Sequence, residues 1–413
     1  MTTLPVVIIG GGQAGLAMSR CLSELDIEHT VIERGDVGQR WRAQSWDSLR
    51  LLTPNWMTRL PGFQYDGDDP NGFMAVPELV TMLERYAAES RAPLETNTTV
   101  LSVERTADRF RVTTDRGVWH AESVVLATGY SDLPAVPAAG RSLARTVTQI
   151  LPNDYQRPAQ LPPGGVLVVG ASATGVQLAD EIQRSGRQVT LAVGRHTRLP
   201  RRYRGQDILW WLDKLGLLSQ PIDAVHAADI SRGQPSLQLV GRPDHATLDL
   251  AVLREVGVRL VGRLCEIDGH TARLAEDLIA TTAAADIKMA EVLTRIDTFI
   301  ELRRLSARAA APFRPTWPLA TDAPNRIDLK GEGIKTVIWA TGYRRAYPWL
   351  KIPVLDARGE IVHEGGVTKV PGLYVLGMNF QRRRNSSFID GVGDDARALA
   401  TLIARAVTGA HVA

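Results

Sequence analysis

The sequence has few of the side chains from which proteins build metal or thiol redox centres. It contains two cysteines, Cys21 and Cys265, and no C-x-x-C pair, so a dithiol centre and a disulfide framework are excluded. The eight histidines are scattered, and no Ser-His-Asp set or metal-ligand spacing is present. We therefore expect no bound metal, and we interpret Cys21, on the apolar side of a predicted helix, as a small core residue.

The chain also lacks signals for membranes and for secretion. No run of 18 apolar residues occurs, so no membrane span is expected. The first residues lead directly into an apolar strand-like segment without room for a signal peptide, which predicts a cytoplasmic protein. The net charge of +3 is too small to indicate a nucleic acid partner. At 413 residues the chain is longer than one core normally supports, and two or more domains are expected.

The strongest motif stands at the beginning of the chain. A β-branched run at 6–9 leads into a glycine turn, a helical pattern and a second apolar run that ends at Glu33. Strand, G-x-G-x-x-G, helix, strand and acid within about 30 residues form a dinucleotide-binding fingerprint. Gly10 makes the tight turn, Gly12 lets the backbone approach a pyrophosphate, and Gly15 lets helix and strand pack closely. Glu33 is placed to accept hydrogen bonds from a ribose.

The same pattern returns in the middle of the chain. An apolar run at 166–169 leads to Gly170 and Gly175, with Ser172 where the middle glycine would be. The next predicted strand ends not in an acid but at Arg195. An arginine at this point suits a 2′-phosphate, which favours NADPH over NADH. Two further candidates for this phosphate contact follow closely, Arg201 and Arg202.

The remaining pattern predicts how the chain divides. A strand end with the sequence A-T-G-Y occurs twice, at 127–130 and at 340–343. The apolar run at 209–212 sits in a predicted helix and is either core or pocket wall. We predict an α/β fold with two Rossmann-like dinucleotide-binding domains. Residues 1–160 and 336–413 form the first, and residues 161–335 form the second, with a helical insertion at about 278–305.

These motifs cover nearly the whole chain. Two fingerprints about 160 residues apart, the repeated A-T-G-Y ends and a returning C-terminal strand resemble the flavin-containing monooxygenase branch of the class B flavoprotein monooxygenases. More narrowly, the chain resembles bacterial flavoproteins named for potassium transport. The segment G-Q-R-W at 38–41 resembles the family's G-x-x-W, which packs against FAD. The resemblance implies FAD at the first fingerprint and NADPH at the second.

The fingerprints and the resemblance together assign the cofactor contacts to individual residues. The predicted contacts are Gly10, Gly12, Gln13, Ala14, Gly15, Glu33, Arg34, Arg40, Trp41, Val100, Ala127, Thr128, Gly129, Tyr155, Gly170, Ser172, Ala173, Thr174, Gly175, Arg195, Thr341, Gly342, Gly377 and Asp390.

One segment departs from the family pattern. That pattern usually reads Phe-x-Gly-x-x-x-His, followed four residues later by an aromatic residue and then Lys or Arg. Here Leu151 takes the place of the histidine, Tyr155 provides the aromatic ring, and Gln156 replaces the basic residue. Because Baeyer–Villiger relatives carry Trp-Pro or Trp-Asp after the histidine, the pair at 155–156 counts against that subtype.

The resemblance also implies a reaction. NADPH would reduce FAD, O₂ would add at flavin C4a to form a peroxyflavin, and the protein would supply orientation and exclude water. The first hypothesis is a monooxygenase that oxygenates a nitrogen or sulfur centre of a small molecule. An acidic substrate is one alternative within this hypothesis. The alternatives are an NADPH oxidase or reductase with an unproductive peroxyflavin, a Baeyer–Villiger-type oxygenation, and a flavin-dependent sensor without catalysis. A homodimer is an open option.

Two stretches are candidates for the substrate pocket. In the first, Asn55 is the candidate catalytic residue, because the family often carries an asparagine near the flavin there; a turn residue is the alternative. The second is the loop 379–385, which lies over or beside the isoalloxazine in related folds. Neighbours in an extended segment point in opposite directions, so Arg382 or Arg384 is predicted to hold an acidic group of the substrate. The alternative is a solvated basic loop or contacts to the cofactors alone.

Overall fold

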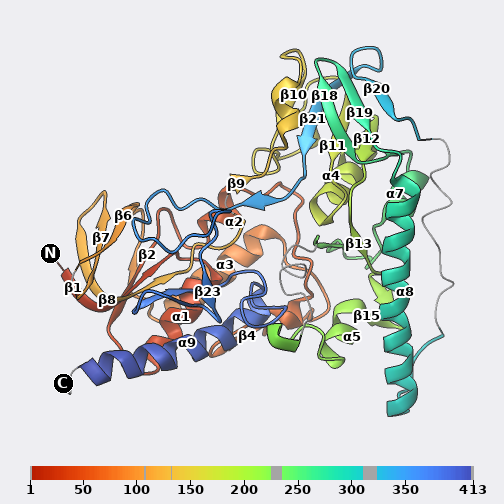
Figure 1. Cartoon of the computed structure of the whole chain (residues 1–413). Coiled ribbons are helices and arrows are strands. Elements are labelled where there is room, and N and C mark those ends of the chain that lie inside the picture. The colour runs from red at the N-terminus through yellow and green to blue at the C-terminus, as the bar shows by residue number, and fades with distance from the viewer. Residues whose placement is uncertain (1, 107, 132, 225–234, 310–322, 411–413) are drawn as a thin grey trace.

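The protein consists of two α/β units that lie side by side, with both chain ends at the far side of the first unit (Figure 1). The computed structural model describes residues 2–106, 108–131, 133–224, 235–309 and 323–410. No helix in these ranges is long and apolar enough to cross a lipid bilayer.

The first unit is built on a sheet that the N-terminal and C-terminal parts of the chain share. Its strand order is β23-β24-β25-β8-β1-β2-β5, and a β6–β7 hairpin joins it at β8. The pairs β1·β2, β1·β8, β2·β5 and β8·β25 are parallel. The strands are β1 (Thr2–Ile9), β2 (His29–Ile32), β5 (Leu94–Glu95), β6 (Val100–Arg105), β7 (Phe110–Thr114), β8 (Val118–Leu126), β23 (His363–Glu364), β24 (Val367–Thr368) and β25 (Leu373–Val375).

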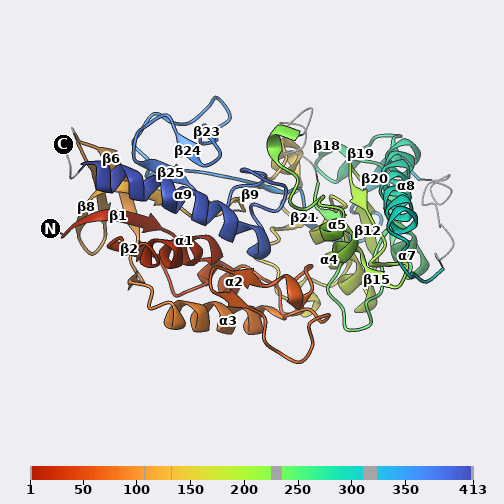
Figure 2. The ribbon, with the colours of Figure 1, turned by 90° about the horizontal axis from the view of Figure 1, so that it is seen from below.

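Both faces of this sheet are covered, which explains why β1 is apolar without interruption at 6–9. Val6 and Ile8 pack in the core with helices α1 (Gln13–Ser23), α3 (Val76–Glu89) and α9 (Ile389–Ala410), which lie together in Figure 2. The alternate residues Val7 and Ile9 pack with the β6–β7 hairpin on the other face. Cys21 lies in the helix-covered core. Burial raises the pKa of its thiol to about 12, so the interpretation as a core residue is confirmed.

The second unit has a smaller sheet of five parallel strands in the order β10-β21-β11-β12-β17. The helices α4 and α7 pack with it, and an antiparallel sheet of β18, β19 and β20 lies beside it. The elements are β10 (Thr148–Ile150), β11 (Gly165–Val169), α4 (Ala173–Arg184), β12 (Val189–Ala192), α7 (Leu250–Glu255), β17 (Arg259–Val261), β18 (Leu264–Asp268), β19 (Thr271–Leu274), β20 (Arg326–Asp328) and β21 (Ile334–Trp339).

The chain passes between the units twice, and the two passages run side by side. Strand β9 (Leu133–Pro134) leaves the first unit and pairs antiparallel with β22 (Tyr343–Arg344), which returns to it. Because β10 and β21 belong to the second sheet, the boundaries lie near 133 and 344. The predicted boundaries at 160 and 336 assigned both strands to the first domain and are corrected here.

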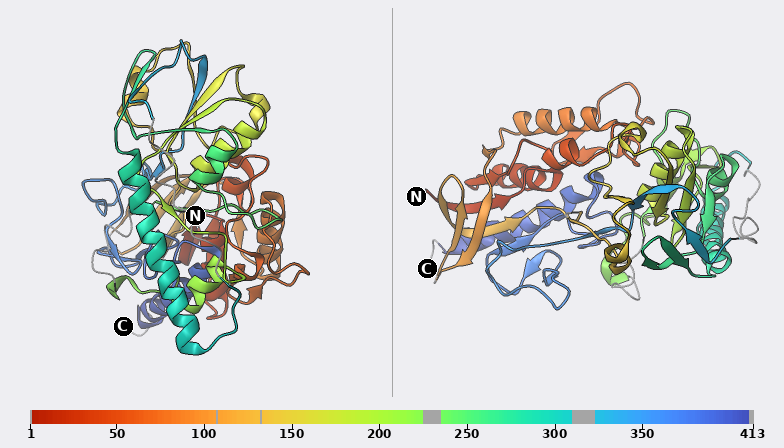
Figure 3. Two further views of the ribbon diagram at one scale, coloured as in Figure 1. Left: turned by 90° about the vertical axis from the view of Figure 1, so that its right-hand side faces the viewer. Right: turned by 90° about the horizontal axis from the view of Figure 1, so that it is seen from above.

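A long helix, α8 (Leu278–Arg303), runs along the outer side of the second unit (Figure 3). It falls within the predicted helical insertion. Ile296 is fully buried against helix α5 (Ile208–Lys214), whereas Ile287 is 61% exposed. The helix is also held by an ion pair between Asp286 and Arg198, with 3.0 Å from Nε to Oδ1. The isoleucines of this helix therefore do not all lie on its packed face.

The remaining described elements are short and form turns and edges. They are α2 (Gln39–Ala43), β3 (Arg59–Leu60), β4 (Phe63–Gln64), β13 (Thr197–Arg198), β14 (Arg202–Tyr203), β15 (Gln206–Asp207), β16 (Leu237–Gln238) and the 3₁₀ turns Asn55–Met57, Ala138–Ser142, Pro158–Gln160 and Ile222–Ala224.

Candidate functional site

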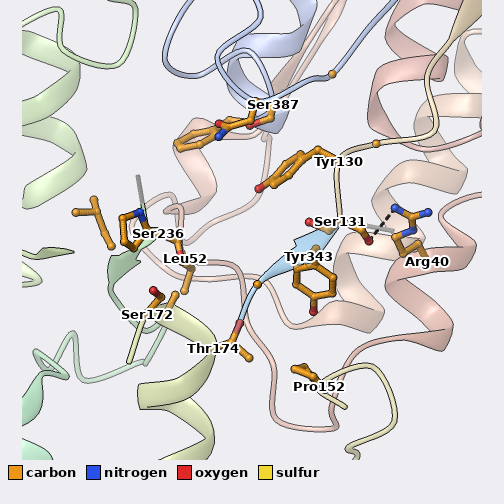
Figure 4. Close-up of a pocket in the computed structure, with 18 of the residues that line it drawn as sticks. Arg40, Leu52, Tyr130, Ser131, Pro152, Ser172, Thr174, Ser236, Tyr343 and Ser387 are labelled. Atoms are coloured by element: carbon orange, nitrogen blue, oxygen red, sulfur yellow. Dashed lines mark hydrogen bonds between the residues drawn. The ribbon is translucent and has the colours of Figure 1, made fainter. Parts of the chain in front are cut away.

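A cavity of about 1610 Å³ runs between the two units. Residues of both glycine turns line it, together with parts of α5, α8 and the segment 377–389. Figure 4 shows this wall: Ser172 and Thr174 come from the second unit, and Arg40, Tyr130 and Ser387 come from the first. One continuous space thus meets the carboxyl ends of strands from both sheets, where open α/β sheets bind ligands.

The first glycine turn has the shape that a pyrophosphate requires. Gly10 has a φ of +113°, and a Cβ there would lie 2.5 Å from the Ala127 carbonyl oxygen. A Cβ on Gly15 would lie 1.8 Å from the carbonyl oxygen of Gly10, whereas one on Gly12 would meet nothing within 4 Å. Gly12 is the N-cap of α1 and no side chain caps this helix. The first amides of α1 are therefore free to bind a phosphate.

The predicted acid lies at the end of β2 in the same cavity. Glu33 accepts hydrogen bonds from the backbone amides of Gly11 at 2.6 Å and Gly35 at 3.1 Å. These bonds fix the carboxylate beside the glycine turn. A carboxylate has about four acceptor sites, so Glu33 keeps acceptor capacity for ribose hydroxyls.

The second turn repeats the first in its close contacts. A Cβ on Gly170 would lie 2.3 Å from the Ala340 carbonyl oxygen, and one on Gly175 would lie 1.8 Å from the Gly170 carbonyl oxygen. Ser172 is the N-cap of α4, and its hydroxyl makes no capping bond. The residues present therefore fit a second dinucleotide phosphate at the N-terminus of α4.

The basic residues after β12 separate into two groups. Arg195 is exposed and lines the cavity, as the predicted 2′-phosphate contact requires. Arg263 also lines the cavity, close to Gly194, because a Cβ on that glycine would come within 3.9 Å of the arginine Cδ. Arg263 was not predicted, because it lies in the loop between β17 and β18 and is distant in sequence from the second glycine turn.

The other arginines are held elsewhere. Arg201 is fully buried, and its guanidinium donates to Asp207 at 2.8 Å and to the Leu52 carbonyl oxygen at 2.7 Å. Arg202 donates to a backbone carbonyl within its own hairpin and does not line the cavity. The prediction that Arg201 or Arg202 contacts the phosphate is therefore corrected, because one arginine joins the two units and the other points away.

Most predicted cofactor contacts lie together at the cavity. Those that line it are Gly10, Gly12, Gln13, Ala14, Glu33, Arg34, Arg40, Trp41, Val100, Ala127, Thr128, Gly129, Gly170, Ser172, Ala173, Thr174, Arg195, Thr341, Gly342 and Gly377. Gly15 and Gly175 lie behind this surface, where they allow helix and strand to approach.

Two predicted contacts do not reach the cavity. Tyr155 is fully buried and its hydroxyl donates to Glu181 of α4 at 3.1 Å. Asp390 begins the last helix, but its carboxylate pairs with Arg59. Burial raises the pKa of Asp390, and the bond to Arg59 opposes this shift. Both side chains therefore have partners within the protein and neither lines the cavity, so their assignment as cofactor contacts is corrected.

Asn55 does not line the cavity either. Its amide nitrogen donates to the Asp69 carbonyl oxygen at 2.9 Å, and its amide oxygen accepts from the Met74 amide at 2.9 Å. The side chain is buried. Both ends of the amide thus hold the loop between β4 and α3, so the assignment of Asn55 as a catalytic residue is corrected in favour of the turn alternative.

The three consecutive arginines point in three directions. Arg382 donates to the Gly365 carbonyl oxygen at 3.3 Å, and Arg383 pairs with Asp394. Arg384 lines the cavity. Of the two predicted substrate contacts, Arg384 alone lines the cavity, and the assignment of Arg382 is corrected to a contact outside it.

Several cavity residues escaped prediction. Ser387 and Tyr130 line the wall from the first unit, and Lys288 and Arg295 line it from α8. The place of Ser387 could have been predicted from the sequence, because this residue stands just before the last helix in a polar loop. The α8 residues had none, since charges on a long helix normally face solvent.

Comparison with known proteins agrees with this geometry. Residues 7–212 match the family model described as pyridine nucleotide-disulphide oxidoreductase. A Geobacillus kaustophilus protein named uncharacterized oxidoreductase CzcO-like is 34% identical over 398 residues, with 95% of this chain and 96% of that protein covered. Indole-3-pyruvate monooxygenase YUCCA1 from rice, Oryza sativa subsp. japonica, is 26% identical, with 90% and 86% covered.

Solved structures give the same class. A flavin-containing monooxygenase from Stenotrophomonas maltophilia has a TM-score of 0.69 at 19% identity, and all of both chains is covered. A thioredoxin reductase from T. acidophilum has a TM-score of 0.52 at 14% identity, with 99% of this chain and 100% of that chain covered. The fold is thus that of flavoproteins with two Rossmann-type domains, of the kind found in flavin-containing monooxygenases. Within this class, the chain belongs to the CzcO-like oxidoreductases.

Proposed function

We propose that the protein is a monooxygenase that uses FAD, NADPH and O₂ to oxygenate a nitrogen or sulfur centre of a small molecule. The observation that carries the proposal is that both glycine turns open on one cavity. A nicotinamide bound at the second turn and a flavin bound at the first can therefore meet without either leaving the protein. The overall reaction consumes NADPH, a proton, O₂ and substrate, and it yields NADP⁺, water and the oxygenated substrate.

The cofactor supplies the hydride acceptor and the site of oxygen activation, and the residues of the chain bind and orient it. The free amides of α1 and the carboxylate of Glu33 would hold FAD. The free amides of α4 and the guanidinium of Arg195 would hold NADPH. The charged residues that follow the two turns support the assignment of FAD to the first and NADPH to the second. The acid Glu33 suits ribose hydroxyls, and Arg195 suits a 2′-phosphate.

The cavity wall supports oxygenation over simple oxidation of NADPH. Leucines of α5 and its following loop line the cavity, among them Leu209, Leu212 and Leu217. An apolar wall excludes water, which would otherwise promote release of H₂O₂. Leu151, in the place of the family histidine, packs in a core of the second unit and does not line the cavity.

Stopped-flow absorbance tests the proposal. The FAD-loaded protein is reduced with NADPH and then mixed with O₂, and the flavin spectrum is followed together with H₂O₂. We expect a spectral intermediate that persists and decays faster when a substrate is present. Immediate return of the oxidised spectrum with one H₂O₂ per NADPH would identify an NADPH oxidase instead, and failure of NADPH to bleach the flavin would identify a binding protein without this chemistry.

A further inference from the structure

One part of the cavity wall, here called the apolar compartment, is formed by residues of a single hydrophobic core. Its wall is apolar and combines side chains from the second unit with the end of the loop before α9. These residues belong to one hydrophobic core and also line the cavity. They are Leu52, Leu199, Leu209, Leu212, Leu217, Leu218, Leu237, Leu239, Met289, Val292 and Phe388. Such a wall suits the apolar body of a small molecule.

Arg384 projects from the edge of this compartment and is fixed by the backbone. Its amide donates to the Gln220 carbonyl oxygen at 3.1 Å, and the next amide, of Asn385, donates to the Leu218 carbonyl oxygen at 3.0 Å. The guanidinium donates to Gln220 Oε1 at 3.2 Å and lies 5.3 Å from the centre of the Phe380 ring. The charge is therefore held at one place in the wall instead of moving with a free side chain.

A second cation approaches the same edge from α8. Burial lowers the pKa of Arg384, and repulsion from Arg295 lowers it further. Lys288, Val292 and Arg295 are spaced four and three residues apart, so they share one face of the helix. All three line the cavity. In the described ranges, neither Lys288 nor Arg295 forms an ion pair, although Glu291 lines the cavity between them.

A hydroxyl completes the polar edge. Ser387 is 8% exposed, and its Oγ has no hydrogen-bond partner among the described residues. It lines the cavity three residues beyond Arg384, on the wall drawn in Figure 4. Buried hydroxyls nearly always have a partner. This one therefore points to a ligand atom that accepts or donates a hydrogen bond.

The other cavity cations have different roles. Arg34, Arg40 and Arg195 lie with the two nucleotide-binding turns. Four more pair with acids: Arg198 with Asp249 and Asp286, Arg345 with Glu360, Arg50 with Glu78, and Arg263 with Asp277. The phosphates of two dinucleotides would bind at the N-termini of α1 and α4. Lys288 and Arg295, beside the apolar compartment, thus suit a third anion.

We propose that this compartment binds a carboxylic acid with an apolar body, with Arg384 and Arg295 at the carboxylate and Ser387 as a further hydrogen-bond partner. The planar guanidinium presents two parallel donors that match a carboxylate. The proposal rests on the proposed function, because it makes this acid the substrate whose nitrogen or sulfur is oxygenated. It also names residues that a neutral amine or sulfide would not need.

Calorimetric titration of the FAD-loaded protein tests the site without any turnover. The probes are 3-phenylpropanoate and its uncharged amide, 3-phenylpropanamide, which share the apolar body. Because a charged hydrogen bond replaces a neutral one, we expect the acid to bind about 10- to 100-fold more tightly than the amide. Absence of acid binding, or equal affinities of acid and amide, overturns the proposal.

Variants locate the charge. Arg384→Met should remove most of the preference for the acid, and Arg295→Met should remove a smaller part because its side chain is exposed. Arg382→Met is the matched control from the same run, and it should keep the preference because its guanidinium lies on the Gly365 carbonyl oxygen. A preference that survives in the Arg384→Met, Arg295→Met double variant overturns the site. If a variant misfolds, the comparison of acid and amide on the unaltered protein still decides.

The outcomes for the site and for the proposed function separate cleanly. Preference for the acid together with immediate release of H₂O₂ after O₂ would keep the anion site and reject the monooxygenase. A persistent flavin intermediate together with equal binding of acid and amide would keep the monooxygenase and reject the anion site.

Discussion

The two glycine turns share their close contacts and differ in the residue at the end of the following strand. In each turn, a Cβ on the last glycine would lie 1.8 Å from the carbonyl oxygen of the first, at Gly15 and at Gly175. The strand after the first turn ends at Glu33, fixed by two backbone amides, and the strand after the second leads to an exposed Arg195. In the proposed assignment, the shape of each turn serves dinucleotide binding in general, while the charge at the end of the next strand selects between FAD and NADPH.

The largest effect should come from breaking both turns separately. In Gly15→Ala the methyl group meets the Gly10 carbonyl oxygen, so α1 must move away from β1, and the protein should purify without FAD. Gly175→Ala makes the same clash in the second turn. It should keep its FAD but lose reduction by NADPH. Flavin absorbance per protein and the rate of anaerobic bleaching measure the two losses, and loss of FAD from both variants alike would contradict separate sites.

Arg195→Ala should remove the discrimination at the second turn. Loss of a charged partner of the 2′-phosphate should weaken NADPH binding about 10- to 100-fold and leave NADH nearly unchanged. The readout is the concentration of each nucleotide that gives half-maximal flavin reduction. Arg202→Ala is the control, since that arginine lies outside the cavity. Equal losses for NADPH and NADH would show that Arg195 only adds positive charge to the surface.

Glu33→Gln should weaken the first turn by a smaller amount. The amide keeps one acceptor oxygen, but its NH₂ group cannot accept the second backbone amide, so one of the bonds from Gly11 and Gly35 is lost. The neutral amide should also bind the ribose of FAD less strongly than the carboxylate, by roughly 1 kcal/mol, so the affinity for FAD should fall about five- to tenfold. Fluorescence of released flavin on dilution measures it. An unchanged affinity for FAD would mean that the Glu33 carboxylate only stabilises the glycine turn and does not bind the cofactor.

Ser172→Gly should have the smallest effect of the four. It gives the second turn the glycine that the first has at Gly12, and the hydroxyl of Ser172 makes no capping bond. NADPH affinity should therefore change by less than about threefold, the scale of one weak interaction. A large loss would show that the hydroxyl itself binds the phosphate and that the two turns hold their ligands differently.

The sequence predicted the features that depend on local chain geometry. Both glycine turns, the helices after them and the placement of Glu33 and Arg195 follow from short-range rules of strand, turn and helix. The sheets around them also follow, because β1 and β11 read as continuous apolar runs. The side chains at these turns face the cavity as a direct result of strand ends and helix starts.

Predictions failed where a side chain has a partner from a distant part of the chain. Asn55 matched a family position, but its partners are backbone groups of another turn. Tyr155 matched an aromatic position, but Glu181 of α4 binds its hydroxyl. Arg201 was predicted to contact a phosphate, but its guanidinium donates to Asp207 and to the Leu52 carbonyl oxygen. No spacing rule reports such contacts, and the domain boundaries were misplaced for the same reason, since β10 and β21 find their partners across the second sheet.

The antiparallel pair of β9 and β22 makes the second unit a module with adjacent ends. Leu133 pairs with Arg344 and Pro134 with Tyr343, so the insertion leaves and re-enters the first unit across a single ribbon. A two-residue hairpin turn spans that width, so the whole second unit can be exchanged without altering the path of the chain through the first. If the proposed cofactor assignment holds, a single insertion at this ribbon suffices to replace the unit that binds the electron donor, and the sheet of the first unit keeps its topology.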